Sequence, residues 1–417
     1  MPLHPVSGPC SWEAADYNDP ASYTTVLSER DVSELVSAIA AAEDSVSKDG
    51  SSIERAVASR EDFPLPTLGP KLVALAEEAK NGRGFVLVKG FPVEKLTRQQ
   101  AVIGYFGLGL YWGNARPNNK RGHLVGHIKD LGHDPALPTT RLYATSAAQP
   151  WHNDSADLVS LLCLSRAETG GESGWCSSVA VHNEVLKVAP EAAKAAAARD
   201  AWFYDRRGEV PKGKKGFFEM PVFNYFRGFL SVNFSSNYFR DSQRFDEVPR
   251  LSPEQLEAIR LIEEHAASPR FALKYELQPG DIQLLSNHTV LHFRGAFEDS
   301  ERQQRHLLRL WLSPEEDRPL PKVRFSGSFS FLSSSSLLFF LSFLIFSPFP
   351  LPLSRFLSLA TCINTNRSTR SSTAAPSSLA REEASGSTGR CSRRKTFTST
   401  SRRSEEMVFF FSGFVFF

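Results

Sequence analysis

The chain has 417 residues, of which 41% are hydrophobic, 23% charged and 11% aromatic, a composition typical of a soluble globular protein. Its 48 Lys and Arg residues almost balance 46 Asp and Glu residues, so the charge gives no reason to expect a nucleic-acid partner. The five cysteines are widely spaced and form no CxxC pair, which excludes an evident disulfide framework or zinc knuckle. The first residues lack the features of a secretory signal. A cytoplasmic location is therefore expected.

The first part of the chain has the apolar spacing of helices. Ser28–Ala41 is an expected helix with Ser28 as its N-cap, and Leu68–Lys80 and Leu96–Leu108 are expected helices as well. Between the last two, Phe85–Val88 is an apolar run bounded by glycines, as is typical of a buried strand.

The second part is richer in strand patterns. Leu158–Leu164 predicts a buried strand, and Ala180–Ala198 predicts one long helix. Further strands are expected over Phe229–Phe234, Phe271–Leu277, Asp281–Leu285, Val290–Phe293 and His306–Leu312. Helices followed by a strand-rich half predict an α+β fold with an antiparallel core, and residues 1–323 are expected to form one domain.

The composition changes after Pro321. Residues 325–354 carry no charge and comprise 10 Ser, 8 Phe, 7 Leu, 3 Pro, one Gly and one Ile. Residues 324–417 contain 11 basic and 4 acidic side chains, whereas residues 1–323 contain 37 and 42. The tail is thus basic and the preceding body mildly acidic.

Three interpretations of this tail compete. Its apolar stretch Leu337–Phe346 is shorter than the roughly 20 residues of a membrane span, which disfavours a tail-anchored protein. A disordered low-complexity tail would normally be more polar. Since pyrimidine-only codons encode Phe, Leu, Ser and Pro, our hypothesis is that residues 324–417 derive from a retained intron or a frameshift.

Candidate metal ligands lie in two segments. The motif WHNDSAD places His152 two residues before Asp154, although a loop histidine beside a capping aspartate would give the same pattern. The strand-like run 281–299 carries His292, 140 positions after His152. Two histidines and one carboxylate form the facial triad that binds non-haem Fe(II) and leaves positions open for other ligands.

Two arginines follow His292, Arg305 after 13 residues and Arg309 after 17. On one strand their side chains would project to the same face, because the side-chain period is two. A guanidinium in an apolar strand needs an anionic partner, and its planar fork matches a carboxylate. Either a dicarboxylate cosubstrate or an internal Asp or Glu would satisfy this requirement.

Four segments together resemble the taurine dioxygenase (TauD/TfdA-like) family of Fe(II)/2-oxoglutarate-dependent oxygenases. The segments are WHNDSADLVSLLCL, TGGESGWCSSVAVHNEVL, PGDIQLLSNHTVLHFRGAFED and RHLLRLWL, and the similarity runs from about Pro9 to Pro321. The resemblance implies a double-stranded β-helix, a jelly roll of the clavaminate synthase-like type, with flanking helices.

The resemblance also implies roles for individual residues. His152, Asp154 and His292 would bind iron, Arg305 would hold the distal carboxylate of 2-oxoglutarate, and Ser173 stands where the family commonly has a cosubstrate-binding Thr. Arg309 aligns with a position that contacts the anionic group of the substrate in the taurine enzymes. His288 lies four residues before His292 and is the alternative ligand, whereas His127 and His182 are expected to be structural or to lie beside the substrate.

The activity that the resemblance implies is hydroxylation of a small, anionic organic substrate with Fe(II), 2-oxoglutarate and O2, releasing succinate and CO2. Three alternatives remain open: a Zn or Mn hydrolase with the same ligands, a catalytically impaired member of the fold, and a tail-anchored membrane protein. The sequence does not indicate the identity of the substrate or an oligomeric state.

Overall fold

The structure is a computed structural model in which residues 3–49, 52–316 and 318–320 are described. The tail 324–417, with its intron, low-complexity and tail-anchor interpretations, lies outside the described residues. Among the helices of the described part, none combines the length and the apolar character needed to cross a membrane.

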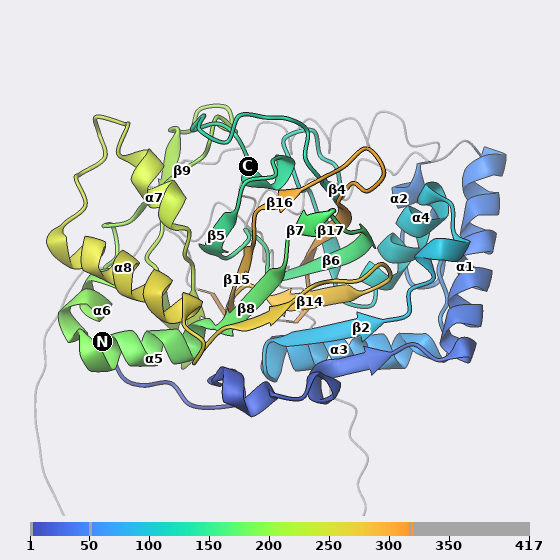
Figure 1. The fold of residues 1–417 in the computed structure, drawn as a ribbon, viewed down its shortest axis with the longest axis horizontal. Helices are drawn as coiled ribbons and strands as arrows, with labels where there is room; N and C mark the ends of the chain where they lie inside the picture. The colour runs from blue at the N-terminus through green and yellow to red at the C-terminus, as the bar shows by residue number, and fades with distance from the viewer. Residues whose placement is uncertain (1–2, 50–51, 317, 321–417) are drawn as a thin grey trace, which may run out of the picture. The chain divides into compact units, whose positions relative to one another are not determined.

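Two β-sheets form the centre of the described structure (Figure 1). The strands of the larger sheet are Thr24–Val26 (β1), Phe85–Lys89 (β2), Asn114–Arg116 (β3), Val125–Ile128 (β4), Leu158–Ser165 (β6), Ile282–Ser286 (β14) and His306–Ser313 (β17). Their order is β1-β2-β14-β6-β17-β3, with β4 also paired to β17. The smaller sheet consists of Gln149–His152 (β5), Ser173–Ser177 (β8), Leu273–Tyr275 (β13) and Val290–Arg294 (β15), in the order β13-β8-β15-β5.

Three short strand pairs complete the sheets. They are Thr169–Gly170 (β7) with Phe297–Glu298 (β16), Phe203–Asp205 (β9) with Phe217–Glu219 (β10), and Phe223–Phe226 (β11) with Phe229–Val232 (β12). The described pairings are antiparallel, as expected, apart from the parallel pair of β1 and β2.

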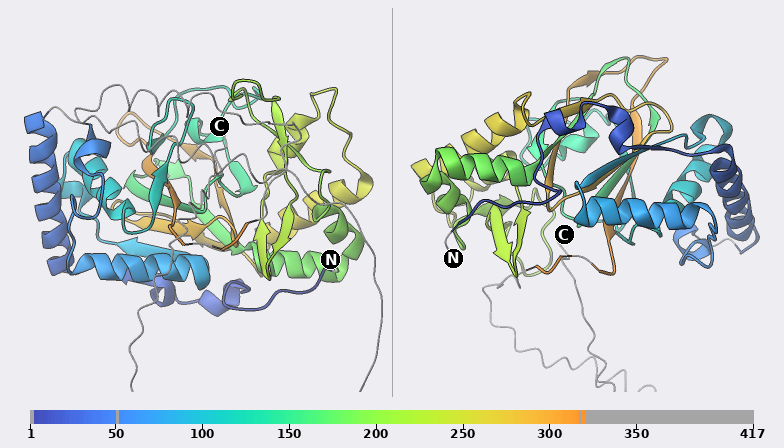
Figure 2. Two further views of the ribbon diagram at one scale, coloured as in Figure 1. Left: turned by 180° about the vertical axis from the view of Figure 1, so that it is seen from behind. Right: turned by 90° about the horizontal axis from the view of Figure 1, so that it is seen from below.

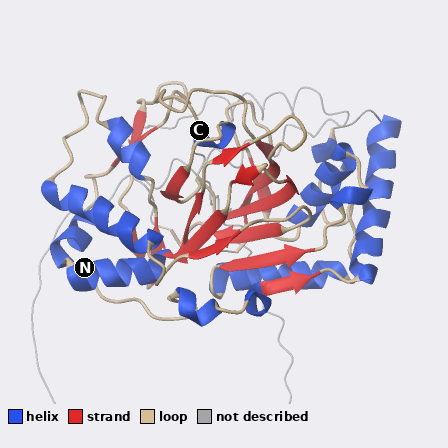
Figure 3. Ribbon diagram, viewed as in Figure 1, coloured by secondary structure: helices blue, strands red, loops and turns tan. Residues whose placement is uncertain are grey.

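The helices form two groups on opposite sides of the strands (Figures 2 and 3). One group consists of Glu29–Asp49 (α1), Ile53–Ala56 (α2), Leu68–Asn81 (α3) and Arg98–Gly109 (α4). The other consists of Ser178–Val188 (α5), Pro190–Ala196 (α6), Ser236–Ser242 (α7) and Pro253–Ala267 (α8). Short 3-10 helices span Ala14–Tyr17, Pro20–Tyr23, Val93–Lys95 and Leu142–Ala144.

Strand alternation divides the core of the larger sheet between its two faces. Val86 and Val88 of β2 join the apolar cluster beneath α1, α3 and α4, whereas Phe85 and Leu87 join a second cluster that includes Trp175 of the smaller sheet. The same alternation in β17 sends Leu308, Leu310 and Leu312 toward the helices. Arg309 and Trp311 therefore face the interior between the two sheets.

Hydrogen bonds at the helix ends explain several of the expected boundaries. Ser28 accepts a hydrogen bond from the backbone N–H of Asp31, and the Asp31 carboxylate accepts from the N–H and hydroxyl of Ser28. The same reciprocal arrangement links Thr97 with Gln100 at the start of α4. Both pairs satisfy backbone donors that the first helical turn leaves free.

Two expectations about helices need correction. The single helix expected over 180–198 is two helices, because Pro190 restricts the backbone of Ala189 and begins α6. The sequence patterns also left out α8, although Ser252, Pro253 and Gln255 form a complete N-terminal capping motif for it.

Candidate active site

Two neighbouring strands bring the candidate histidines together. β5 and β15 are antiparallel, and their register pairs His152 directly with His292. The two imidazole ring centroids are 4.2 Å apart. A separation of 140 residues in the chain thus becomes a direct cross-strand contact.

The backbone after β5 is held by a network of amide hydrogen bonds. The Asn153 side chain donates to the carbonyls of Asn287 and Val290, and its oxygen accepts from the N–H of Phe234. The backbone N–H of Asp154 donates to the side-chain oxygen of Asn287, over 3.0 Å. The turn between β14 and β15 therefore fixes the backbone position of Asp154.

The result is a compact set of ligand atoms. His152, Asp154 and His292 each offer one atom within 4.8 Å of the atoms offered by the other two. Among the described residues this is the group of His, Cys, Asp and Glu side chains close enough to hold a metal ion. Two neutral imidazoles and a carboxylate are a donor set that suits divalent iron.

Hydrogen bonding selects the tautomer of His152. Its Nδ1 lies 2.7 Å from the carbonyl oxygen of Pro150 and donates to it, so Nε2 carries the lone pair. Nε2 lies 3.8 Å from Asp154 and 2.8 Å from the side-chain nitrogen of Gln149. This geometry directs the ligand nitrogen of His152 toward the centre of the group.

Burial keeps both imidazoles neutral at neutral pH. It lowers the pKa of His292 to about 3 and also lowers the pKa of His152, for which the nearby Asp154 carboxylate partly opposes the shift. The Nδ1 atom of His292 is buried and has no hydrogen-bond partner among the described residues. Both rings are therefore in the unprotonated form that metal binding requires.

Asp154 is held by two side chains of β17. Trp311 donates its indole N–H to Oδ2 over 2.8 Å, and the Arg309 guanidinium lies 3.3 Å from the same oxygen. Burial alone would raise the pKa of Asp154, but Arg309, His292 and His152 outweigh it and hold the pKa well below its ordinary value. The carboxylate is thus ionised.

Arg309, which the family resemblance places beside the substrate, contacts side chains of this chain. Its Nε donates to the side-chain oxygen of Asn118, and its guanidinium lies over the rings of Tyr143 and Trp311 at 5.0 and 4.4 Å. The internal carboxylate partner that the sequence left open is therefore Asp154. The Nη2 atom of Arg309 is buried and has no partner among the described residues.

Arg305 lies outside the strand that carries Arg309. β17 begins at His306, and its pairing with β6 shifts register between His306 and Leu307, so the two arginines do not share one uninterrupted strand. The Arg305 guanidinium is buried over Phe297, with Nη1 unpartnered among the described residues. Burial lowers its pKa to about 10. Ser173 begins β8 and is also buried.

The other candidate histidines lie elsewhere. The His288 ring is 3.0 Å from the Asp157 carboxylate and is not part of the three-ligand group. His127 contacts His306, and His182 is buried between Tyr225 and Asn183. Each of the three thus has a local partner.

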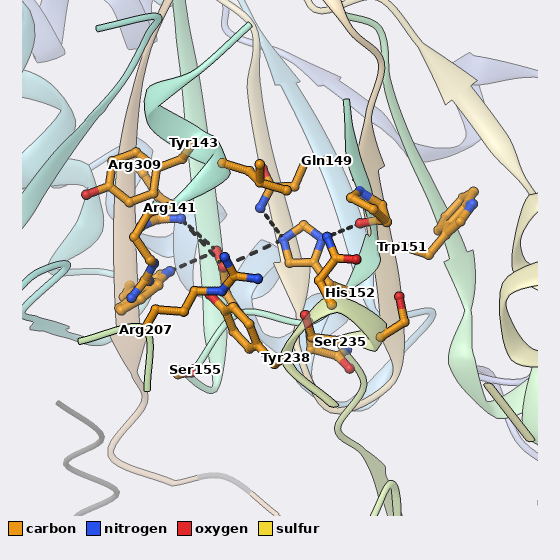
Figure 4. Close-up of a pocket in the computed structure, with 17 residues that line it drawn as sticks. Arg141, Tyr143, Gln149, Trp151, His152, Ser155, Arg207, Ser235, Tyr238 and Arg309 are labelled. Atoms are coloured by element: carbon orange, nitrogen blue, oxygen red, sulfur yellow. Dashed lines mark hydrogen bonds and ion pairs between the residues drawn. The ribbon is translucent and has the colours of Figure 1, made fainter. Parts of the chain in front are cut away.

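A small cavity of about 40 Å³, partly open to solvent, lies beside His152 and Asp154 (Figure 4). Arg141, Arg207 and Arg309 line one side of it, across from His152. Arg141 pairs with Glu209 and Arg207 with Asp241. Tyr143, Ser235 and Tyr238 add polar groups to the wall. The cavity thus places these polar groups next to the ligand group.

Sequence reasoning missed several residues that shape this site. Trp311 could have been found, because it lies two positions after Arg309 on the same face of a strand. Asn118, Gln149 and Asn287 reach the site from a loop, a strand start and a turn, and their local sequences carry no pattern that marks them. Long-range packing alone brings them there.

Comparison with known proteins gives a consistent result. The profile of the family described as "Taurine catabolism dioxygenase TauD, TfdA family" matches residues 49–311. The chain is 32% identical over 326 residues to FR-33289 synthase from Streptomyces rubellomurinus, covering 76% of this chain and 93% of the relative. It is 30% identical over 321 residues to taurine hydroxylase-like protein SAT17 from Stachybotrys chartarum, covering 72% and 77%.

Solved structures share the fold at low sequence identity. An asparagine oxygenase in complex with Fe(II), 2S,3S-3-hydroxyasparagine and succinate has a TM-score of 0.52 at 16% identity, covering 70% of this chain and 93% of its own. The non-haem iron oxygenase OrfP, with Fe, succinate and (3S)-hydroxy-L-Arg, has a TM-score of 0.52 at 13% identity, covering 70% and 94%.

Proposed function

Since the chain belongs to the TauD/TfdA family of non-haem iron, 2-oxoglutarate-dependent oxygenases, we propose that it hydroxylates a small anionic organic molecule. In this reaction 2-oxoglutarate is converted to succinate and CO2. The observation that carries the proposal is the His152, Asp154 and His292 group, with ligand atoms within 4.8 Å of one another beside a cavity.

The residues fit a bound iron. His152 has the lone pair of Nε2, which a bound metal would take in place of the Gln149 amide, and Asp154 is ionised. The His292 ring has no competing hydrogen bond to its buried Nδ1 from the described residues. Bound there, Fe(II) would supply the centre at which 2-oxoglutarate and O2 react. Trp311 and Arg309 orient the carboxylate that would hold it, which is the usual task of residues behind a metal ligand.

Arg305 and Ser173 are the proposed binding residues for the distal carboxylate of 2-oxoglutarate. The Arg305 guanidinium is 5% exposed, and its Nη1 has no partner among the described residues. A buried cation of this kind is costly unless an anion binds it. A carboxylate that accepts from both the guanidinium and a serine hydroxyl would satisfy it.

The substrate is proposed to bind in the cavity beside His152. Arg141, Arg207 and Arg309 lie along its wall, and Nη2 of Arg309 is buried and unpartnered among the described residues. Each of the three arginines is paired with a carboxylate of the protein, so the unpartnered Nη2 of Arg309 is the donor that supports an anionic substituent on the substrate. The two solved structures of similar fold are complexes with hydroxylated amino acids, which supports a small molecule of similar size.

The two central sheets are proposed to be the two halves of a double-stranded β-helix. β8 and β15, at the centre of the smaller sheet, carry Trp175 and Val290 into the same apolar cluster as Phe85 and Leu285 of the larger sheet. In this arrangement the ligand group lies inside the barrel, where the surrounding side chains exclude bulk water. Residues 1–323 are the proposed domain.

Succinate release measures the proposed activity directly. The enzyme would be supplied with Fe(II), 2-oxoglutarate and O2 and tested against sulfonates, amino acids and aryloxy acids. We expect substrate-dependent succinate formation with at least one anionic candidate, and loss of it in His152→Ala. Succinate formation that persists in His152→Ala would remove the iron-site assignment. Activity with Zn(II) and no 2-oxoglutarate would favour a hydrolase instead.

A further inference from the structure

Arg294 is a second buried arginine close to the candidate metal site. It ends β15 two residues after His292, so both side chains project to the same face of the strand. Arg294 is 5% exposed, and its Nε and Nη1 atoms are buried without a partner among the described residues. Its Nη2 donates to the backbone carbonyl of Ala147.

No carboxylate among the described residues forms an ion pair with Arg294 or with Arg305. Their guanidinium carbons lie 4.9 and 5.3 Å from the centroid of the same Phe297 ring. An aromatic ring offsets part of the cost of burying a cation, but it leaves the N–H donors unsatisfied. An anion that accepts hydrogen bonds from both guanidiniums would satisfy these donors.

The strand register places Arg294 at the proposed cosubstrate site. On β15, Arg294 lies opposite Ser173 of the neighbouring strand β8 and opposite Gln149 of the other neighbouring strand, β5. Arg305 reaches the same end of β8, because a Cβ atom on Gly171 would lie 2.9 Å from its Nε. Two arginines therefore converge near Ser173, and neither forms an ion pair with a carboxylate of the described residues.

We propose that Arg294 is a second arginine for the distal carboxylate of 2-oxoglutarate, acting together with Arg305. This inference rests on the proposed function. Two residues along a strand span roughly 6.6 Å, a distance that suits an oxo acid bound at one end beside His292 and at the other beside Arg294. A carboxylate has enough acceptor sites for both guanidiniums and the Ser173 hydroxyl.

The consequence is strong selection for a dicarboxylate. A 2-oxo acid without the distal carboxylate would leave two buried guanidiniums unsatisfied, which disfavours its binding. 2-Oxovalerate keeps the chelating end and the chain length of 2-oxoglutarate but lacks this charge. The ratio of the two affinities therefore reports on the arginines and not on the metal ligands.

The test measures anaerobic binding of both acids to the Fe(II)-loaded enzyme by calorimetry and by the visible band of the chelate. Arg294→Gln keeps a polar side chain with N–H donors but removes the charge. We expect it to bind 2-oxoglutarate about 10- to 100-fold more weakly and 2-oxovalerate within roughly 3-fold of the unmodified enzyme. Arg294→Lys should give an intermediate loss.

Arg302→Gln is the matched control, because Arg302 is exposed in the segment before β17 and should leave both affinities unchanged. Thermal unfolding of each variant confirms that it is folded. If Arg294→Gln weakens the binding of both acids equally, or weakens the binding of neither, the inference is wrong. If the unmodified enzyme itself does not prefer 2-oxoglutarate to 2-oxovalerate, the proposed function fails instead.

Discussion

The indole N–H of Trp311 is the direct hydrogen-bond donor to Asp154 at 2.8 Å. Trp311→Phe removes this donor and keeps an aromatic ring beside Arg309. We expect metal affinity to fall by about 10-fold, at the low end of the effect of removing a partner of a metal ligand. Titration with Fe(II) or Co(II) under anaerobic conditions measures it.

Trp112→Phe is the matched control for this change. The indole N–H of Trp112 is buried without a partner among the described residues, and Trp112 is not part of the ligand group or the cavity. The same substitution there should alter stability but leave metal affinity unchanged. Equal losses of affinity in both variants would contradict the role given to Trp311.

His182 makes stability depend on pH. Burial lowers its pKa from 6.5 to about 4, although a hydrogen bond to Asn183 opposes the shift. The unfolded chain therefore takes up a proton at a higher pH than the folded protein does. The stabilising contribution is complete above about pH 6.5 and is lost as the pH falls toward 4, by on the order of 3 kcal/mol.

His182→Gln should flatten that dependence. Urea unfolding at several pH values between 7.5 and 4.5 gives the free energy of unfolding of both proteins. We expect the difference between them to shrink steadily as the pH falls, because the variant lacks the titrating ring. A difference that stays constant over this range would show that His182 does not carry the effect.

At the scale of elements, the turn before β8 gives Arg305 its space. Gly171 has φ of +78°, and a Cβ atom there would meet Arg305. Gly171→Ala should therefore destabilise the fold by about 1–2 kcal/mol through backbone strain and also weaken 2-oxoglutarate binding, by at least roughly 10-fold. Chemical unfolding and anaerobic 2-oxoglutarate titration separate these two effects.

Gly122→Ala is the control that measures the effect of backbone strain alone. Gly122 has φ of +82°, and a Cβ atom there would have no neighbour within 4 Å. The variant should lose similar stability while binding 2-oxoglutarate normally. Normal binding by Gly171→Ala would mean that Arg305 does not depend on this turn.

Local sequence was sufficient for the elements whose pattern is strong. β2, β6, β14, β15 and β17 were each expected within two residues of their observed bounds, because apolar alternation and flanking glycines identify buried strands. β5 was not expected, since QPWH is too short and mixed to show a period. Its pairing with β15 is visible in three dimensions alone.

The same distinction holds for the candidate site. The spacing of His152, Asp154 and His292 could be read from the sequence with the family resemblance, and the structure brings these side chains together. The contact of Arg309 with Asp154 could not be predicted from the sequence, because it joins residues 155 positions apart. The separate position of Arg305 depends on a shift in strand register that the sequence does not mark.

At the scale of the whole molecule, the residues of the proposed site all precede Pro314. A chain that ends after Val323 should therefore fold and bind Fe(II) and 2-oxoglutarate within roughly 2-fold of the full chain. Comparing thermal unfolding and anaerobic titration for the two chains tests this. A shorter chain that does not fold would show that the domain needs the tail.

Transcript sequencing across the codons for 321–361 addresses the origin of the tail. The intron hypothesis expects a spliced message that lacks this segment. Peptides from 324–417 in cellular protein would contradict it. Sedimentation of the full chain with membranes, while the shorter chain remains in the supernatant, would instead support the tail-anchor alternative.

The pairing of β5 with β15 also sets a time order for a chain leaving the ribosome. His292 is made 140 residues after His152, an interval of roughly 7–28 s at ordinary rates of synthesis. During that interval the nascent chain holds two of the three ligands and lacks the strand that aligns them. Metal capture at the proposed site would therefore be a late event, and a message broken before codon 292 would yield a product without the third proposed ligand.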